Sequence, residues 1–309
     1  MKPAPRIVLL CATRRGVAFV RRIFTLCPEA GFVVCSFPEE PWEPPFLAEL
    51  EGVVKAAGQR MIVTRQVATA DLFQAGECDL LLAVNWRYLV PREVYARFRR
   101  GAFVFHDSLL PRYRGFSPTN WAMINGERET GVTLFEMVES VDSGRIVDQA
   151  AVPIGPEEFI GSVVDRVTAA YLLLLERNLA RLLAGTAELR AQNDAEATYT
   201  CKRVPDDNRI SWPAPAARVF DLIRACSSPY PGAYCFWEGK RLTIWTCDLP
   251  DRTRPHVGVV PGRIIERVPG QGVRVLANDF PLLLRKVQLE GGPVVTADEL
   301  LKSLAQTLT

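Results

Sequence analysis

Five short apolar runs in the first third of the chain constrain its fold more than any other feature. Each run is nearly continuous rather than alternating, which is typical of strands buried on both faces of a parallel sheet. The segments between them are long enough for helices, and residues 16–26 and 91–100 show the clearest helical pattern. Strands alternating with helices predict an α/β domain with a Rossmann-like parallel sheet. The five runs are Arg6–Ala12, Gly31–Phe37, Arg60–Thr64, Asp79–Asn85 and Ala102–His106.

The chain after these runs changes character twice. Thr130–Met137 and Gly144–Val152 are two further strand candidates, and the apolar spacing of Ile160–Leu183 predicts one long helix ending before Gly185. A polar, aperiodic stretch follows, and we interpret residues 191–204 within it as a linker between a first domain, residues 1–190, and a second, residues 205–309.

The second domain has the pattern of a small β-structure. Its apolar runs are short, alternate with polar residues and are separated by Gly and Pro, except for a helical pattern over residues 215–226. Such spacing predicts a small OB-like β-barrel.

Composition places the chain among ordinary globular proteins. It is 48% hydrophobic and 23% charged, and a net charge of +2 requires neither nucleic acid nor an anionic membrane as partner. The eight cysteines contain no CxxC pair, so we expect reduced, packed thiols in a cytoplasmic protein rather than a zinc site. The first apolar run is too short for a signal peptide, and no run reaches the roughly 20 residues of a membrane span.

Several well-known catalytic and nucleotide-binding motifs are absent from the sequence. The first strand is followed by "CATRRG" rather than GxGxxG, so no dinucleotide fingerprint is present. Walker, HExxH and GxSxG motifs are also missing.

His106 is the strongest candidate for chemistry that the residues alone offer. It is one of only two histidines and stands where a predicted parallel strand ends, which is where open α/β sheets bind ligands. An imidazole there is a candidate general base, and Asp142, which lies just before another strand, is its candidate acidic partner. The adjacent Asp107 is expected to point to the opposite face. A hydrogen-bonded structural histidine remains the alternative.

Two sequence motifs then give a resemblance to a known family. "HDSLLPRYRG" (His106–Gly115) and "NWAMINGERETGVTLFEMVESVDSG" (Asn120–Gly144) closely resemble the hydroxymethyl-, formyl- and related transferases, which use 10-formyltetrahydrofolate. The resemblance covers most of Arg6–Val152. The segment Asp206–Trp245 resembles the C-terminal domain of methionyl-tRNA formyltransferase and of the UDP-4-amino-arabinose formyltransferase.

The resemblance implies roles for individual residues. His106 matches the family's catalytic histidine and Asp142 its acidic partner, while Asn120 either faces the acceptor or only packs a helix. The implied reaction is attack of a neutral primary amine on the formyl carbon of 10-formyltetrahydrofolate, with His106 moving the proton and no metal required. The implied folate-contacting residues are Tyr88, Leu89, Val90, Phe116, Val138, Glu139, Ser140 and Val141.

Val104 departs from the family pattern. The family carries asparagine two positions before the histidine, whose amide can donate to the oxyanion, and valine can donate nothing. Loss of one such donor typically costs about 10²–10³ in rate. Three explanations stay open: a slow enzyme, a replacement donor such as Asn85, Asn120 or water, or a chain that kept the fold and lost or changed the reaction.

The acceptor is expected to be a small molecule. Ser36–Glu51 has five glutamates and no Lys or Arg, which would repel phosphates, and Cys201–Thr309 has 15 basic against 11 acidic residues, so nucleic acid is not expected as a partner. The motif variants resemble sugar-nucleotide N-formyltransferases, which favours a nucleotide-linked amino sugar. The alternatives are another small amine, methionyl-tRNA, hydrolysis of the folate, or a folate- or nucleotide-binding pseudoenzyme; a homodimer is a further possibility.

Overall fold

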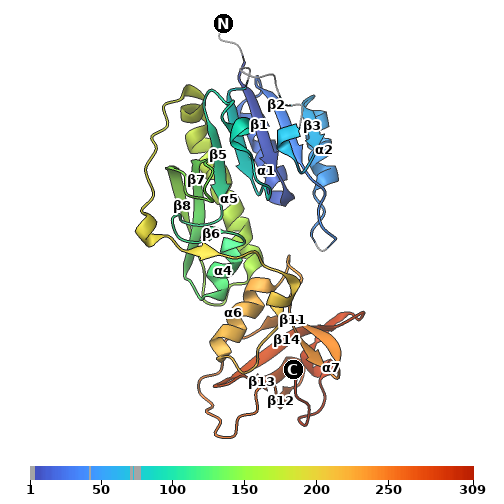
Figure 1. Cartoon of the computed structure of the whole chain (residues 1–309). Coiled ribbons are helices and arrows are strands. Elements are labelled where there is room, and N and C mark those ends of the chain that lie inside the picture. The colour runs from blue at the N-terminus through green and yellow to red at the C-terminus, as the bar shows by residue number, and fades with distance from the viewer. Residues whose placement is uncertain (1–3, 42, 70–71, 73–77) are drawn as a thin grey trace. The chain divides into compact units, whose positions relative to one another are not determined.

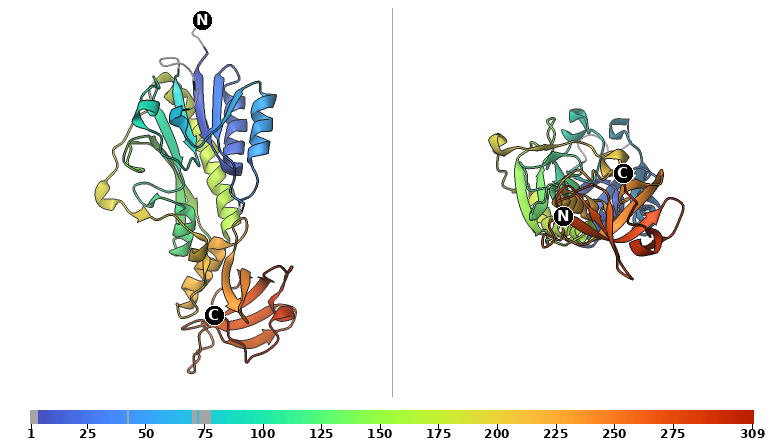
Figure 2. Two further views of the ribbon diagram at one scale, coloured as in Figure 1. Left: turned by 45° about the vertical axis from the view of Figure 1, so that its right-hand side comes forward. Right: turned by 90° about the horizontal axis from the view of Figure 1, so that it is seen from below.

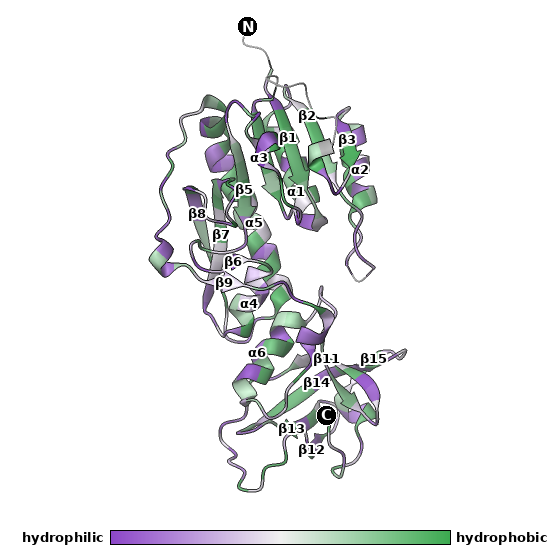
Figure 3. Cartoon of the chain, viewed as in Figure 1, coloured by the Kyte–Doolittle hydropathy of each residue, from purple (hydrophilic) through white to green (hydrophobic). Residues whose placement is uncertain are grey.

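The continuous apolar runs form the centre of a seven-stranded sheet in the computed structural model, which describes residues 4–41, 43–69, 72 and 78–309. The strand order is β3-β2-β1-β4-β5-β7-β8 (Figure 1). Figure 3 shows the apolar character of β1, β2 and β5. Their bounds are β1 (Arg6–Cys11), β2 (Gly31–Ser36), β3 (Arg60–Val63), β4 (Leu80–Val84), β5 (Ala102–His106), β7 (Glu129–Glu136) and β8 (Ile146–Pro153).

The strand directions confirm the predicted parallel sheet and add an antiparallel side. β1 pairs in parallel with β2 and β4, β2 with β3, and β4 with β5. β7 then runs antiparallel to β5, with His106 opposite Thr133. His106 is therefore the last residue of β5, at the carboxyl end of the parallel strands, as the sequence predicts.

Two helices, α1 (Thr13–Leu26) and α5 (Ile160–Ala184), lie side by side along this sheet (Figure 2). Arg22 of α1 and Glu176 of α5 form a 2.7 Å ion pair. Tyr171 of α5 stacks on Phe105 of β5 with ring centroids 5.5 Å apart. The long helix predicted from the spacing of Val and Leu residues is thus present, and it packs directly behind the strand that carries His106.

The helix expected over residues 91–100 is much shorter in the structure. Only Arg92–Tyr95 forms α3. Beyond it the N–H groups of Arg97, Phe98 and Gly101 donate to carbonyls three residues back, which is turn geometry rather than α-helix. Gly101 has a positive φ of 96°, and the turns bury Phe98 and lead the chain directly into β5. The predicted helix is therefore present only over its first turn, because the chain turns back at Arg97–Gly101 to enter β5.

Shorter elements complete the two units of the structure. They are α2 (Leu47–Ala56), β6 (Arg114–Gly115), α4 (Pro118–Ile124), β9 (Tyr199–Thr200) and the 3-10 helices η1 (Val67–Thr69), η2 (Asp194–Glu196) and η3 (Pro205–Asn208). One unit comprises residues 1–118, 130–152 and 165–201, and the other comprises residues 119–129, 153–164 and 202–309. The stretch 191–201, interpreted from sequence as part of a linker, therefore groups with the first unit.

The second unit is built on an antiparallel sheet of the order β10-β11-β14-β13-β12, with β15 added beside β14. The last residues bond to both outer strands: Thr309 exchanges backbone hydrogen bonds with Phe236 of β10, and Ile264 of β12 donates to the Gln306 carbonyl. The strands of this sheet and α6 share one apolar core. The elements are α6 (Ala216–Cys226), β10 (Ala233–Trp237), β11 (Lys240–Cys247), β12 (Ile264–Val268), β13 (Gly272–Leu276), β14 (Pro281–Leu289), β15 (Val294–Thr296) and α7 (Ala297–Leu300).

A search of the described residues for a helix that is both long and apolar enough to cross a bilayer finds none.

Candidate functional site

The imidazole of His106 is held by a backbone carbonyl. Its Nε2 atom lies 2.9 Å from the carbonyl oxygen of Tyr113. A carbonyl can only accept a hydrogen bond, so Nε2 carries the hydrogen and the lone pair of the neutral ring is on Nδ1. The side chain of His106 is about one-tenth exposed. The ring is therefore fixed in one tautomer, with Nδ1 as the atom that can take a proton.

Asp142 faces that nitrogen. Its Oδ2 atom lies 3.7 Å from Nδ1 of His106, which is too long for a hydrogen bond but within the distance of an ion pair. The structure thus brings together the two predicted catalytic residues. It also shows that the Tyr113 carbonyl makes the hydrogen bond that orients the ring.

The loop that carries Asp142 is tied down from two directions. The backbone N–H of Gly115 donates to Oδ2 of Asp142 at 2.8 Å, and Asp142 has a positive φ of 49°. The side-chain amide of Gln192 donates to the carbonyls of Asp142 and Gly144, at 2.8 and 2.7 Å. A left-handed backbone is unfavourable for a residue with a side chain. These contacts therefore stabilise a conformation of Asp142 that the loop would not favour by itself.

β6 and β9 bring the segment after α5 against the "YRG" motif. They pair in parallel, with Arg114 opposite Tyr199 and Gly115 opposite Thr200. A β-carbon on Gly115 would lie 2.4 Å from the carbonyl oxygen of Thr200, so only glycine fits there. Sequence reasoning missed this contact because nothing in the polar, aperiodic stretch indicates pairing with a distant motif.

A buried ion pair anchors the residue next to His106. Nη1 of Arg15 lies 2.7 and 2.6 Å from the two carboxylate oxygens of Asp107. The hydroxyl of Tyr171 is within hydrogen-bond distance of both the Asp107 carboxylate and the Phe105 carbonyl. Burial raises the pKa of Asp107, but Arg15 and Tyr171 outweigh it and hold that pKa below its ordinary value of 3.8. The Asp107 carboxylate thus bonds to α1 and α5 and secures the end of β5.

The side chain of Val104 also lies in apolar surroundings. Val104 is half-buried and packs against Leu110, Phe135 and Ile146. Among the proposed replacement donors, the side-chain oxygen of Asn85 accepts a 3.2 Å hydrogen bond from Arg15.

Asn120 belongs to the second unit, and its amide is engaged there. It is buried, and its Nδ2 donates to the carbonyl of Ala225 at 2.8 Å. This contact is the packing role that the sequence left open; contact with an acceptor stays a prediction.

Several of the predicted folate-contacting residues expose apolar side chains on loops that follow strands. Leu89 is 86% exposed, and Phe116, Val138 and Val141 are also exposed. Tyr88 is less exposed, because its ring packs edge-to-face on Phe37. Val90 packs against the apolar core below β4, whereas Glu139 and Ser140 are exposed.

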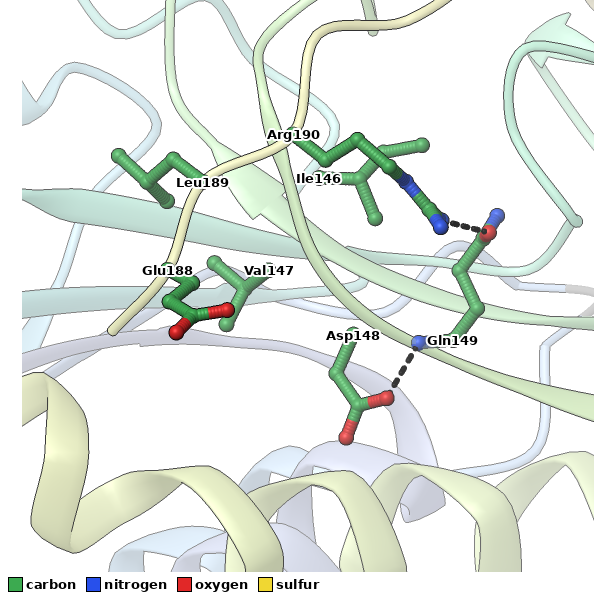
Figure 4. A pocket seen from close by; sticks show the side chains of 7 residues that line it. All are labelled: Ile146, Val147, Asp148, Gln149, Glu188, Leu189 and Arg190. Atoms are coloured by element: carbon green, nitrogen blue, oxygen red, sulfur yellow. Dashed lines mark hydrogen bonds between the residues drawn. The ribbon is translucent and has the colours of Figure 1, made fainter.

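A separate pocket of about 500 Å³ lies along β8 (Figure 4). Its walls are residues 146–149 and 188–190, and none of the predicted site residues is among them. Arg190 donates to the side chain of Gln149 there at 3.0 Å.

Comparisons with known proteins show which family the sequence matches. Residues 9–177 match the family model described as formyl transferase, and residues 202–305 match the model of the formyl transferase C-terminal domain.

The fold is also that of solved structures at low sequence identity. An N-formyltransferase from Helicobacter canadensis, solved with folinic acid and dTDP-3-aminofucose, has a TM-score of 0.66 at 16% identity, over 91% of this chain and 98% of that chain. A HypX variant from Aquifex aeolicus has a TM-score of 0.62 at 19% identity, over 96% of this chain. The present chain spans about half (47%) of that HypX chain.

Methionyl-tRNA formyltransferase from Clostridium thermocellum has a TM-score of 0.52 at 18% identity, over 79% of this chain and 93% of that chain. At these identities the likeness concerns the fold, whereas the family model covers more than half of the sequence, including His106 and Asp142. The chain therefore belongs to the formyl transferase family.

Proposed function

We propose that this protein transfers a formyl group from 10-formyltetrahydrofolate to the primary amine of a small acceptor, a nucleotide-linked amino sugar. The observation that carries the proposal is the pairing of His106 and Asp142 at the carboxyl end of β5, next to a complete SLLPxYRG motif at Ser108–Gly115. The family membership of the chain supports the reaction class.

The geometry supports Nδ1 of His106 as the atom that takes the proton. The amine nitrogen attacks the formyl carbon, forming the new C–N bond, and the bond between that carbon and the folate nitrogen then breaks. Nδ1 of His106 takes the proton released by the amine and returns it to the leaving folate nitrogen. Throughout, Nε2–H stays bound to the Tyr113 carbonyl and the charge of Asp142 stabilises the imidazolium.

The donor side of the proposal depends on the exposed apolar loops. Leu89, Phe116 and Val141 offer apolar contact area, and the backbone groups beside them offer hydrogen bonds, which suits a flat heteroaromatic ring. The folinic acid in the Helicobacter canadensis structure is a formylated folate, and its presence in a protein of this fold supports the same class of donor here.

The choice of a small acceptor in this proposal rests on the negative charge of Ser36–Glu51, the segment that follows β2. Glu40 pairs with Arg65 at 3.6 Å and Glu43 pairs with Arg87, so part of its negative charge is balanced within the protein. No Lys or Arg is present in Ser36–Glu51 to contact a phosphate backbone. A small acceptor therefore suits this chain better than the acceptor stem of a tRNA.

Val104 favours one competing function. Because the apolar side chain offers no donor to an oxyanion, the same fold is compatible with a binding protein that transfers no formyl group. Hydrolysis of the formyl folate is tested by following the release of tetrahydrofolate with no amine present.

Calorimetric titration with 5-formyltetrahydrofolate tests the donor site, and repeating it with a panel of nucleotide-linked amino sugars tests the acceptor. We expect saturable folate binding, and turnover of 10-formyltetrahydrofolate with the matching amine. His106→Ala should abolish turnover while folate still binds. His256→Ala is the matched control, because His256 belongs to the second unit and bonds only locally, to the Arg254 carbonyl. Absence of folate binding at millimolar ligand, or full turnover by His106→Ala, would contradict the proposal.

A further inference from the structure

Gln192 occupies an unusual place beside the candidate catalytic pair. Its side chain is half-buried, and both ends of its amide are used. The nitrogen donates to the carbonyls of Asp142 and Gly144, and the oxygen accepts from Nε and Nη2 of Arg114, at 3.1 and 2.7 Å. One side chain therefore connects the "YRG" motif to the loop that carries Asp142.

Arg114 makes this connection rigid. It is 3% exposed, and its guanidinium also contacts the carboxylate of Asp194 at 2.6 Å and the hydroxyl of Tyr199 at 3.2 Å. A buried guanidinium with several charge-assisted or neutral partners has little freedom to move. The oxygen of Gln192 is thereby held, and the orientation of its amide fixes where the two N–H bonds point.

The loop on the other side of Gln192 needs such support. Asp142 has a left-handed backbone, and a β-carbon on Gly144 would lie 1.7 Å from the Glu136 carbonyl, so the loop is pressed against the end of β7. The Asp142 carboxylate lies 3.7 Å from Nδ1 of His106, beyond hydrogen-bond distance, and acts on it through its charge. Small movements of the loop therefore change the interaction that the proposed reaction uses.

From these contacts we infer that Gln192 is a positioning residue, which holds the Asp142 carboxylate opposite Nδ1 of His106 by pinning the carbonyls of Asp142 and Gly144. The inference rests on the proposed function for its kinetic consequence, but the positioning itself can be observed without turnover. Arg114 supports Gln192 from behind.

Two substitutions separate the contact of the Gln192 oxygen with Arg114 from the contacts of its nitrogen with the loop. Gln192→Leu removes both kinds of contact. Gln192→Glu keeps an oxygen for Arg114, and turns that contact into an ion pair, but it removes the N–H donors and places a negative charge near two carbonyl oxygens. If Gln192 served only to satisfy Arg114, Gln192→Glu would behave like the wild type. If it positions Asp142, both variants lose the same function.

The first measurement is the imidazole NMR signal of His106 in protein made with isotope-labelled histidine. With only two histidines in the chain, the His256→Ala variant assigns both signals. We expect the His106 signal to shift in Gln192→Leu and Gln192→Glu, while the His256 signal stays in place. Asn193→Leu is the matched control, because Asn193 is the exposed neighbour whose side chain bonds only within Asn193–Glu196.

The second measurement is the rate of formyl transfer by the same variants. Loss of two hydrogen bonds to the loop should lower kcat about tenfold or more in both Gln192 variants, with a smaller change in KM for the amine. Wild-type kcat in Gln192→Glu, or an unchanged His106 signal in a folded Gln192→Leu, would overturn the positioning role. If the wild type transfers no formyl group, the proposed function fails, and the NMR comparison still decides the role of Gln192.

Discussion

The backbone N–H of Gly115 donates a 2.8 Å hydrogen bond to Oδ2 of Asp142, the carboxylate oxygen that faces His106. Gly115 has a φ of 109°, and its backbone packs closely against the Thr200 carbonyl. The position of the acidic partner is therefore decided partly by a glycine in a different motif.

Gly115→Ala should disrupt the site more than an ordinary glycine substitution. Its new β-carbon would lie 2.4 Å from the Thr200 oxygen, so β6 and β9 must separate and the hydrogen bond to Asp142 must lengthen. We expect a loss of about 2–4 kcal/mol in the free energy of unfolding, together with a large fall in formyl transfer. Gly58→Ala is the matched control, because Gly58 also has a positive φ, of 65°, but has open space around its β-carbon. Equal losses in the two variants, measured by denaturant unfolding, would contradict the steric explanation.

Asp107 should make stability depend on pH in the acid range. Its pKa is lower in the folded protein than its ordinary value, so its contribution to stability is present at neutral pH and is lost as the pH falls through that lowered pKa. We expect Asp107→Asn to be less stable by about 3 kcal/mol at pH 7, because it leaves Arg15 buried without its charge partner.

The wild type should also lose more stability than Asp107→Asn when the pH is lowered from about 5 to about 3, a range that brackets the ordinary aspartate pKa. Denaturant unfolding at each pH measures both effects. Asp165→Asn, an exposed change in the same unit, should stay within about 0.5 kcal/mol of the wild type. Parallel pH profiles for wild type and Asp107→Asn would show that the ion pair does not carry the effect.

Val104→Asn should increase turnover if the site lacks only an oxyanion donor. One restored donor is worth about 10²–10³ in kcat, whereas placing an amide among Leu110, Phe135 and Ile146 should cost about 1–3 kcal/mol of stability. Val104→Ala makes space without adding a donor and should not increase kcat. Steady-state kinetics with the amine identified by calorimetry makes the comparison. A Val104→Asn variant that binds folate but gains no turnover would favour the binding-protein function.

Thiol titration should count one reactive cysteine. Seven of the eight cysteines are buried, and only Cys201 is exposed. Burial raises the pKa of Cys226 to about 11 and those of Cys35 and Cys235 to about 12, so these thiols stay protonated at pH 8. A chromogenic disulfide reagent should therefore modify one thiol in the native protein, none in Cys201→Ser, and all eight in denaturant. Rapid modification of several native thiols would contradict the packing of the core.

The parallel sheet could be predicted from the sequence because strands buried on both faces are continuous runs of apolar residues. Arg6–Ala12 and Ala102–His106 are continuous apolar runs, and both became strands with nearly those bounds. The proximity of His106 and Asp142 also followed, since His106 ends a strand, Asp142 lies just before another, and both match the family motif. The short α3 was overpredicted because an amphipathic pattern does not reveal that the chain must turn back after four residues.

The remaining parts of the site could not be predicted for a physical reason. The group that orients His106 is the carbonyl of Tyr113, and every residue has such a carbonyl, so no side chain marks it. Gln192 lies 50 residues beyond Asp142, in a polar stretch without periodicity, and its role appears only when β9 pairs with β6. The hydrogen bonds from Arg114 to Gln192 and from Gln192 to the Asp142 carbonyl form only once these loops have folded together.

The alternation of the chain between its two units has a consequence for protein engineering. Residues 119–129 and 153–164 are assigned to the same unit as residues 202–309, although they lie within the matched N-terminal family region. A chimera joined at residue 202 would therefore combine a new C-terminal part with two inherited segments adapted to the old one, including Asn120 and its bond to Ala225. Exchange of this module between relatives needs to carry all three segments together.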